Sequence, residues 1–417
     1  MASAEQLIEN LKGIEATNFA DNAERIRARD ALLDALRRVQ SPWDLAWDHN
    51  WVNPATNAAI KTLIDAGVFT KWAEAGGEPI TCTKLAELTG ADELLIRTRP
   101  LQHSSPANRL LTFLGRMMRC ISGQLLVREV GLDTYARTPW ARALAEDKSF
   151  PGIYGGFYHE MNSPMFRTLP EYIKSIGFKN PTDPNDCNVH FWHGGNKDFN
   201  MFEYVATNPK LTSDFNDAME CHSKYNLTPW PEVYPTDNIV ADAKPGVPLV
   251  VDVGGGKGHD LKKFLACHLD ACKEPGSLVL QDLPGILKGV EEELATPTIK
   301  VQPHDFFTAQ PVKGARVYFM HNVLHDWPDA SAADILKKLA ASMEKGYSKV
   351  LIHESLVSKE KPLSRVTVSD ITMMAFASAA ERTEDQWTAL VESAGLRVVK
   401  IWRPVYSVES VIEAELA

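Results

Sequence analysis

The chain has 417 residues, of which 44% are hydrophobic and 24% are charged, and its formal net charge at pH 7 is −10. Its length predicts two or three domains with ample apolar cores, and its acidic balance argues against nucleic acid or an anionic membrane as the main partner. Because the six cysteines form no CxxC pair, and neither a signal peptide nor a membrane-spanning apolar stretch is visible, we expect a soluble cytoplasmic protein.

Residues 1–142 are expected to form an N-terminal domain built mainly of helices. Apolar residues at helical spacing over 4–40 predict amphipathic helices, which would pack either on a partner subunit or on the chain itself. Residues 83–96 are typical of a winged helix-turn-helix, so a DNA-binding regulator is one interpretation. The second helix of this motif would place carboxylates where the phosphates of DNA should lie, which weakens that interpretation. Residues 100–109 break the helical pattern and predict a surface loop or an insertion.

The second segment, residues 143–235, is unusually rich in aromatic residues and methionine, and we expect it to be helical. Core packing explains any one of these side chains, but a dense cluster interleaved with amides and histidines suits a pocket for a flat apolar ligand. We therefore predict a substrate-binding segment, whose candidate contacts are Phe157, Met161, Asn162 and Met165. A proline- and aspartate-rich stretch, residues 228–246, marks its boundary.

From residue 236 to residue 417, short apolar strands alternate with helices. The predicted strands are 248–253, 278–283, 299–307, 315–323, 349–357 and 396–402, and the predicted helices are 259–269, 331–344 and 384–394. This alternation predicts a parallel, doubly wound, Rossmann-like α/β sheet. Ser331 and Asp334 have the spacing of a capping box, which predicts that the helix begins at residue 331.

A glycine-rich turn follows the first strand, in VDVGGGKGH at residues 251–259. Ligands of doubly wound sheets bind beyond the carboxyl ends of the strands, and glycines let main-chain N–H groups approach a ligand. A P-loop is excluded because Lys257 is followed by Gly258 rather than by Ser or Thr. The dinucleotide fingerprint fails because His259 stands where it needs glycine. The class of ligand that remains is a nucleoside without a pyrophosphate.

Two further strand ends narrow the choice of ligand. Asp282 is placed to accept both hydroxyls of a ribose, and Asp305 with Phe306 suits an adenine amino group and ring face. Together with the glycine turn, these residues predict S-adenosylmethionine as the cofactor. The alternative is that both acids serve only as cap or turn residues.

HNVLHDW, residues 321–327, presents two histidines four positions apart. A zinc site needs at least a third ligand, and HxxxH without the HExxH pattern is a poor start, so we expect no metal. Catalysis by His325 is the better interpretation, because Glu354 and Glu381 follow at later strand ends. A purely structural, buried His325 is the alternative.

The motifs VDVGGGKGH, LQDLPG, HDFF, HNVLHDWPD, HESLV and ERTEDQW resemble, in order and spacing, the caffeic-acid-type small-molecule O-methyltransferases. The sequence of these motifs, and the segment NPTDPND, are most similar to the fungal branch of the family, which modifies aromatic secondary metabolites. The resemblance covers nearly the whole chain. It implies helices that form a homodimer, a winged-helix domain, and a Rossmann-like catalytic domain that binds S-adenosylmethionine.

The resemblance also implies roles for individual residues. His325 would be the general base that takes the proton of a substrate hydroxyl, and Glu354 and Glu381 would orient its imidazole. The cofactor would be held by Gly254, Gly256, Asp282, Asp305, Phe306, His321 and Trp327. Candidate contacts of an aromatic or polyketide acceptor are Phe157, Met161, Asn162, Met165, Asp326 and Met374.

Two points stay open at this stage. His321 stands where the family usually has Lys or Arg, and we expect a neutral imidazole there to be a weaker charge partner. Some relatives are understood to keep S-adenosylmethionine as a bound cation while they catalyse dehydration or pericyclic ring closure. The presence of His325, Glu354 and Glu381 favours methyl transfer but does not exclude that alternative.

Overall fold

The computed structural model describes residues 3–91, 113–225, 228–294, 296–404 and 408–417. The chain divides into two compact units between Ala59 and Ile60. The three-part division at residues 142 and 235 stays a prediction. No helix among these described ranges is long and apolar enough to cross a membrane.

The first unit is helical, as predicted. Its elements are α1 (Ala4–Leu11), η1 (Ala16–Asn18), α2 (Asn22–Val39), α3 (Pro42–Trp47), the π-helix η2 (Asp48–Val52) and the start of α4 (Asn53–Asp65). Ser3, Asp21 and Ser41 each accept a backbone N–H of the following turn, which fixes where α1, α2 and α3 begin. The unit exposes many large apolar side chains.

The second unit opens with short helices around a small antiparallel sheet. These elements are α5 (Val68–Glu74), β1 (Ile80–Thr81), α6 (Cys82–Thr89), α7 (Phe113–Gly123), β2 (Val127–Gly131), β3 (Thr134–Arg137) and α8 (Pro139–Glu146), with strand order β1-β3-β2. Helix α6 matches the first helix of the predicted helix-turn-helix. Most of the predicted second helix and the whole 100–109 loop lie outside the described residues.

The aromatic-rich segment is helical, as predicted. It contains α9 (Phe150–Gly152), the π-helix η4 (Ile153–Asn162), α10 (Ser163–Ser175), α11 (Asn188–Trp192), α12 (Met201–Ala206), α13 (Pro209–Tyr225) and α14 (Trp230–Val233). Helix α15 (Asp237–Val240) follows the segment. Asp214 on α13 accepts the N–H of Gly156 at 2.7 Å. A Cβ at Gly156 would lie 2.8 Å from the same carboxylate, so glycine permits this close approach of η4 to α13.

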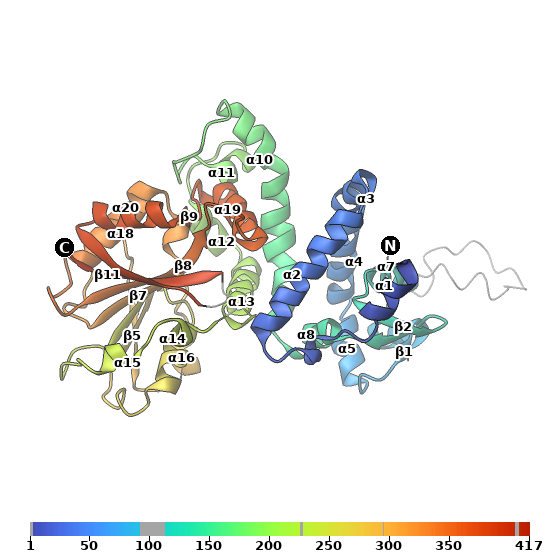
Figure 1. The fold of residues 1–417 in the computed structure, drawn as a ribbon, viewed down its shortest axis with the longest axis horizontal. Coiled ribbons are helices and arrows are strands. Elements are labelled where there is room, and N and C mark those ends of the chain that lie inside the picture. Colours follow the sequence, from blue (N-terminus) through green and yellow to red (C-terminus); the bar gives the residue numbers. More distant parts are fainter. Residues whose placement is uncertain (1–2, 92–112, 226–227, 295, 405–407) are drawn as a thin grey trace, which may run out of the picture. The chain divides into compact units, whose positions relative to one another are not determined.

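The large sheet has the strand order β10-β11-β8-β7-β4-β5-β6, with β9 paired to β8 (Figure 1). Its strands are β4 (Val250–Val253), β5 (Leu278–Asp282), β6 (Ile299–Pro303), β7 (Val317–His321), β8 (Lys349–Val357), β9 (Arg382–Thr383), β10 (Leu396–Trp402) and β11 (Glu409–Leu416). The Rossmann-like prediction is confirmed, but a wholly parallel sheet is wrong. β11 was not predicted, and it runs antiparallel to both β8 and β10.

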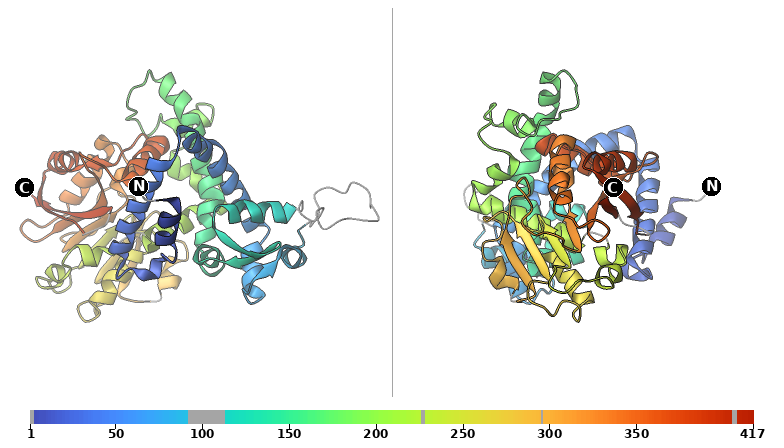
Figure 2. Two further views of the ribbon diagram at one scale, coloured as in Figure 1. Left: turned by 45° about the vertical axis from the view of Figure 1, so that its right-hand side comes forward. Right: turned by 90° about the vertical axis from the view of Figure 1, so that its left-hand side faces the viewer.

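Helices cover both faces of this sheet, as the views in Figures 1 and 2 agree. Alternating strand residues point to opposite faces. Val251, Tyr318 and Ile352 pack with α18 (Asp329–Ala340) and α20 (Glu384–Ser393), whereas Val250 and Phe319 pack with α14 and α16 (His259–Cys267). Both cores are made of fully buried apolar side chains. They fix the carboxyl ends of the parallel strands, where the predicted site residues lie.

The helices of the sheet domain are α16 (His259–Cys267), α17 (Val290–Leu294), the 3₁₀-helix η5 (Leu324–Asp326), α18 (Asp329–Ala340), α19 (Ser364–Ala377) and α20 (Glu384–Ser393). The predicted capping box of Ser331 and Asp334 is wrong, because α18 begins at Asp329. Pro328 precedes its first turn and no side chain caps it. A proline suits a helix start, since its missing N–H would be unpaired there.

Candidate active site

The predicted glycine turn follows β4 and has the backbone conformation that requires glycine. Gly254 and Gly256 have φ of 78° and 55°. A Cβ at Gly254 would lie 2.9 Å from a methyl carbon of Val323. The turn therefore passes directly against the 321–327 loop, at the strand ends where a cofactor is expected.

Asp282 and Asp305 make turn contacts. Asp282 accepts the N–H of Gly256 at 2.9 Å and that of Leu283 at 2.7 Å, and burial raises the pKa of its carboxyl group. The exposed Asp305 accepts the N–H of Phe307 at 2.9 Å. A carboxylate has about four acceptor positions, so these contacts leave capacity for a ribose or an adenine.

An aromatic cluster surrounds Trp327. Its ring lies 6.0 Å from Phe306, 4.7 Å from Phe307 and 5.8 Å from Phe202, between centroids. The indole N–H is buried, and no hydrogen-bond partner is found for it among the described residues. Phe307 and Phe202 were not predicted as site residues. The signal for Phe307 was its place in the HDFF motif, directly after Phe306. The glycine turn, the strand-end carboxylates and these rings fit an adenosyl cofactor.

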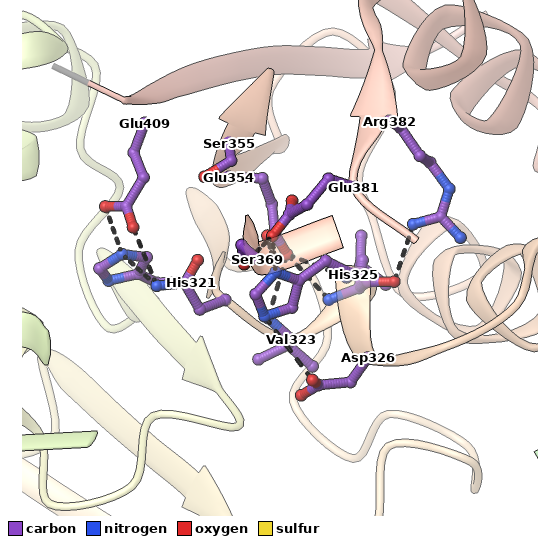
Figure 3. A network of polar contacts seen from close by, with 12 residues as sticks. His321, Val323, His325, Asp326, Glu354, Ser355, Ser369, Glu381, Arg382 and Glu409 are labelled. Atoms are coloured by element: carbon purple, nitrogen blue, oxygen red, sulfur yellow. Dashed lines mark hydrogen bonds and ion pairs between the residues drawn. The ribbon is translucent and has the colours of Figure 1, made fainter. Parts of the chain in front are cut away.

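His325 lies in η5, buried between acidic side chains (Figure 3). Its Nδ1 is 2.9 Å from Glu381 Oε1 and 3.4 Å from Glu354 Oε2. Glu381 Oε1 also accepts the hydroxyl of Ser369 at 2.6 Å. On the other side of the ring, Nε2 is 3.6 Å from Asp326 Oδ1, which is beyond a hydrogen bond. Nε2 is therefore the nitrogen left to receive a proton.

The two predicted orienting glutamates do different things. Glu381 bonds the ring of His325 directly. Glu354, completely buried, bonds the backbone: its Oε1 accepts the N–H groups of Val323, Leu324 and His325 at 3.0, 2.9 and 3.3 Å. Three convergent N–H bonds hold the short loop in place, so Glu354 sets the position of the base as well as its charge.

Arg382 holds the far side of the same loop, and the sequence did not point to it. Its guanidinium is buried and donates to the carbonyl oxygens of Leu324 and Trp327 at 2.9 and 2.6 Å, and to Asp329 at 2.8 Å. Its position directly after Glu381 was the available signal. The loop is thus clamped between a buried carboxylate and a buried guanidinium.

Charge around His325 favours its protonated form. Burial alone would lower the pKa of His325, but Glu354, Glu381 and Asp326 raise it well above the ordinary value. Burial raises the pKa of Asp326 to about 6. Burial also raises the pKa of Glu354 to about 7, while the N–H groups that donate to it favour the ionised form.

His321 is not the neutral imidazole that the sequence analysis expects. Its Nδ1 is 2.6 Å from Asp260 Oδ2, and its Nε2 is 3.0 Å from Glu409 Oε2. Burial opposes a charge here, but the two carboxylates raise the pKa of His321 to about 10. His321 is therefore a fixed cation, like the Lys or Arg it replaces. Both ring nitrogens are engaged, so a direct bond to the cofactor would require one of these contacts to break.

Two other histidines of this neighbourhood stay neutral. Burial and the cation at His321 lower the pKa of His353 to about 3, and its ring lies 4.1 Å from that of His321. Burial lowers the pKa of His222 to about 4; its Nε2 is 3.2 Å from Glu409 Oε1. His222, His353 and Glu409 were not predicted as site residues.

The candidate acceptor contacts fall into two groups. Phe157, Met161 and Met165 belong to one cluster with Phe376, and both methionines are completely buried. Asn162 has a buried amide oxygen without a hydrogen bond among the residues that the structure describes. Met374 is half-buried on α19. Asp326 is the one candidate that lies against the free nitrogen of His325, and all six assignments stay predictions.

Among the residues that the structure describes, two clusters have side-chain atoms that could bind a metal ion within 4.8 Å of one another. One is His321 with His353 and Glu409, and the other is His325 with Glu354 and Glu381. The nitrogens of His321 and Nδ1 of His325 already face carboxylates at hydrogen-bond distance. The expectation of no metal stays a prediction.

We expect His353 to contribute a loss of stability as pH drops below about 6.5. His353 binds a proton when unfolded but not when folded, because burial keeps its folded pKa at about 3. His321 carries its proton in both states at pH 5; its contribution to stability is fully present below about pH 6.5 and is lost as pH rises from there toward about 10. Urea denaturation at pH 7 and pH 5 should show that His353→Gln reduces the pH-dependent loss by about 2 kcal/mol. Equal losses in both proteins would contradict a buried neutral His353.

Comparison with known proteins connects this geometry to a family. The O-methyltransferase domain family matches residues 184–397. O-methyltransferase mfmE of Annulohypoxylon moriforme is 32% identical over 412 residues, which cover 99% of this chain and 96% of that protein. O-methyltransferase asqD of Emericella nidulans is 35% identical over 381 residues, covering 90% and 89%.

Solved structures share the fold over nearly the whole chain. LepI in complex with SAM has a TM-score of 0.84 at 23% identity and covers 99% of this chain and 98% of its own. OxaC in complex with SAH and oxaline has a TM-score of 0.78 at 24% identity and covers 99% and 96%. Since relatives above 30% identity cover almost all of the sequence, the chain belongs to the O-methyltransferase family and is an S-adenosylmethionine-dependent O-methyltransferase.

Proposed function

We propose that this enzyme methylates a hydroxyl group of an aromatic or polyketide-type secondary metabolite, with His325 as the general base. One observation carries the proposal. His325 Nδ1 is hydrogen-bonded to Glu381, while Nε2 has no carboxylate of the described residues within hydrogen-bond distance. A histidine held in this way has one free nitrogen and a fixed orientation, which is the arrangement a general base needs.

The residues around the glycine turn would hold the cofactor: Gly254 and Gly256 through the backbone, Asp282 at the ribose, and Phe306 and Trp327 at the adenine. When bound, S-adenosylmethionine supplies an activated methyl group. The protein must hold the acceptor oxygen close and in line with the carbon that it attacks, since such alignment supplies much of the rate.

His325 Nε2 would take the proton of the acceptor hydroxyl as that oxygen forms its bond to carbon. Glu381 keeps the other ring proton on Nδ1 and stabilises the resulting imidazolium. Asp326 lies beside Nε2 and would contact the acceptor. The apolar cluster of Phe157, Met161 and Met165 would exclude water on the acceptor side.

A second function has a specific observation in its favour. A structure described as a pericyclic reaction enzyme has a TM-score of 0.84 to this chain at 23% identity. A related role here would leave S-adenosylmethionine bound but not consumed. The presence of His325, Glu354 and Glu381 in one hydrogen-bonded group favours methyl transfer.

The transfer itself is tested with methyl-labelled S-adenosylmethionine and a panel of phenols. We expect label in product for the wild-type enzyme, with and without EDTA, and a loss of at least about a hundredfold for His325→Ala, in line with the usual contribution of a general base. Cofactor affinity, measured by calorimetry, should change little. Cofactor that binds but is never consumed would overturn the transferase role, and full activity of His325→Ala would overturn the base.

The pH profile tests the carboxylates. Three acidic groups raise the pKa of His325, so the acid limb of kcat/KM should lie above pH 6.5 in the wild type. Removing one of them in Glu381→Gln lowers that pKa, so the limb should move to lower pH while the maximum rate falls. A limb that stays in place would show that Glu381 does not act through the charge of His325.

We propose that the enzyme is a cytoplasmic homodimer formed through its first unit. That unit exposes Leu32, Leu33, Leu36, Trp43, Trp47 and Trp51, an apolar surface of the kind that subunits cover. The rings of Trp47 and Trp51 stack at 4.9 Å between centroids, and Trp43 lies 6.1 Å from Trp47.

Light scattering tests the assembly. Wild-type protein should have twice the mass of one chain, and Trp47→Glu should reduce the mass to that of one chain by placing a charge in the interface. Leu269→Glu, at an exposed leucine of the second unit, is the matched control and should remain a dimer. A monomeric wild type would contradict the proposed assembly.

A further inference from the structure

Glu409, on the last strand of the sheet, is the centre of a second buried polar cluster. Its side chain is almost fully buried. Oε2 lies 3.0 Å from His321 Nε2, and Oε1 lies 3.2 Å from His222 Nε2 and 3.1 Å from Asn322 Nδ2. His353 Nε2 is 3.8 Å from Oε2. One carboxylate on β11 thus contacts residues of α13, β7 and β8, and Figure 3 shows its bonds to His321 beside the His325 group.

The same carboxylate holds the beginning of the base-bearing loop. Glu354 fixes the N–H groups of residues 323–325, while Glu409 fixes the side chains of His321 and Asn322. Asn322 has φ of 51°, a left-handed conformation that costs energy unless local contacts compensate. The chain bends there, three residues before His325, so the hydrogen bond from Asn322 to Glu409 supports the bend that places the base.

Helix α13 connects this cluster to the acceptor side. Its Phe215 ring lies 6.1 Å from Phe157 and 6.3 Å from Phe202, between centroids. Phe202 in turn packs on Trp327. Seven residues after Phe215, His222 meets Glu409. One helix therefore carries both an aromatic wall of the proposed pocket and a contact to the residue that holds the catalytic loop.

We propose that Glu409 is a positioning residue that couples helix α13 to the loop of residues 321–325, so that His325 is correctly placed only when α13 is packed against Glu409. The proposal rests on the proposed function for its kinetic test. Its structural test does not depend on any acceptor.

The central variant is Glu409→Gln, which keeps the shape of the side chain but removes its charge and replaces one carboxylate oxygen by an NH2 group, which cannot accept a hydrogen bond. With the best phenol of the panel, we expect kcat to fall by about 10- to 100-fold, the usual effect of losing a partner that orients a functional residue. Cofactor Kd should change by less than about threefold. Glu409→Asp, which keeps the charge, should recover part of kcat.

Glu413→Gln is the matched control. Glu413 is a buried carboxylate on the same strand, bonded to the indole N–H of Trp402 at 3.0 Å and 3.6 Å from Lys349, away from the loop. Both variants remove a buried charge from β11, but only Glu409→Gln should lower kcat. Equal losses in the two variants would reduce Glu409 to a structural role.

Hydrogen exchange of the full chain separates this proposal from the proposed function. In Glu409→Gln, peptides covering 321–327 and 209–225 should both lose protection, while Glu413→Gln should leave both unchanged. Loss in one segment alone, or in neither, would overturn the coupling even if the enzyme is active. Loss in both segments would support the coupling even if no phenol is methylated, in which case only the transferase role fails.

Discussion

The proposed reaction depends on one buried hydrogen bond, from His325 Nδ1 to Glu381. The bond fixes which ring nitrogen is free, and it favours the charge that the ring acquires when it takes a proton. Its partners come from distant parts of the chain, so it exists only because the sheet brings them together. Glu354 on β8 and Arg382 on β9 hold the backbone of the loop, which includes the short helix η5, from two sides.

Two imidazoles of the same loop are held by pairs of carboxylates, but the two arrangements differ. His325 has its acidic partners mainly at one nitrogen, which leaves the other available to an acceptor. His321 has one carboxylate at each nitrogen and so cannot exchange a proton without losing a buried ion pair. Breaking such a pair leaves an uncompensated charge and costs about 3–5 kcal/mol. The first ring is therefore suited to chemistry, and the second to holding structure and charge.

Much of this site could be predicted from the sequence because parallel strands end at one edge of the sheet. That rule located the glycine turn, Asp282, His325 and Glu354 without any coordinates. It missed Glu409, because β11 is antiparallel and presents its first residue, rather than its last, at the same edge. The sequence also predicted a neutral His321. The carboxylates that favour its charge come from α16 and β11, which lie far from it in sequence. Arg382 and Phe307 are neighbours of predicted residues, yet only the fold shows what they contact.

The position of β11 also bears on how the protein is made. β11 follows β10 in the chain but lies between β10 and β8 in the sheet. This part of the sheet therefore cannot be completed until residues 409–416 have been synthesised. Domains generally fold as units, the N-terminal domain first. A nascent chain with the glycine turn, His325 and both orienting glutamates would still lack Glu409, the carboxylate that holds the loop. The catalytic loop can therefore be secured only after the last strand of the sheet has been synthesised.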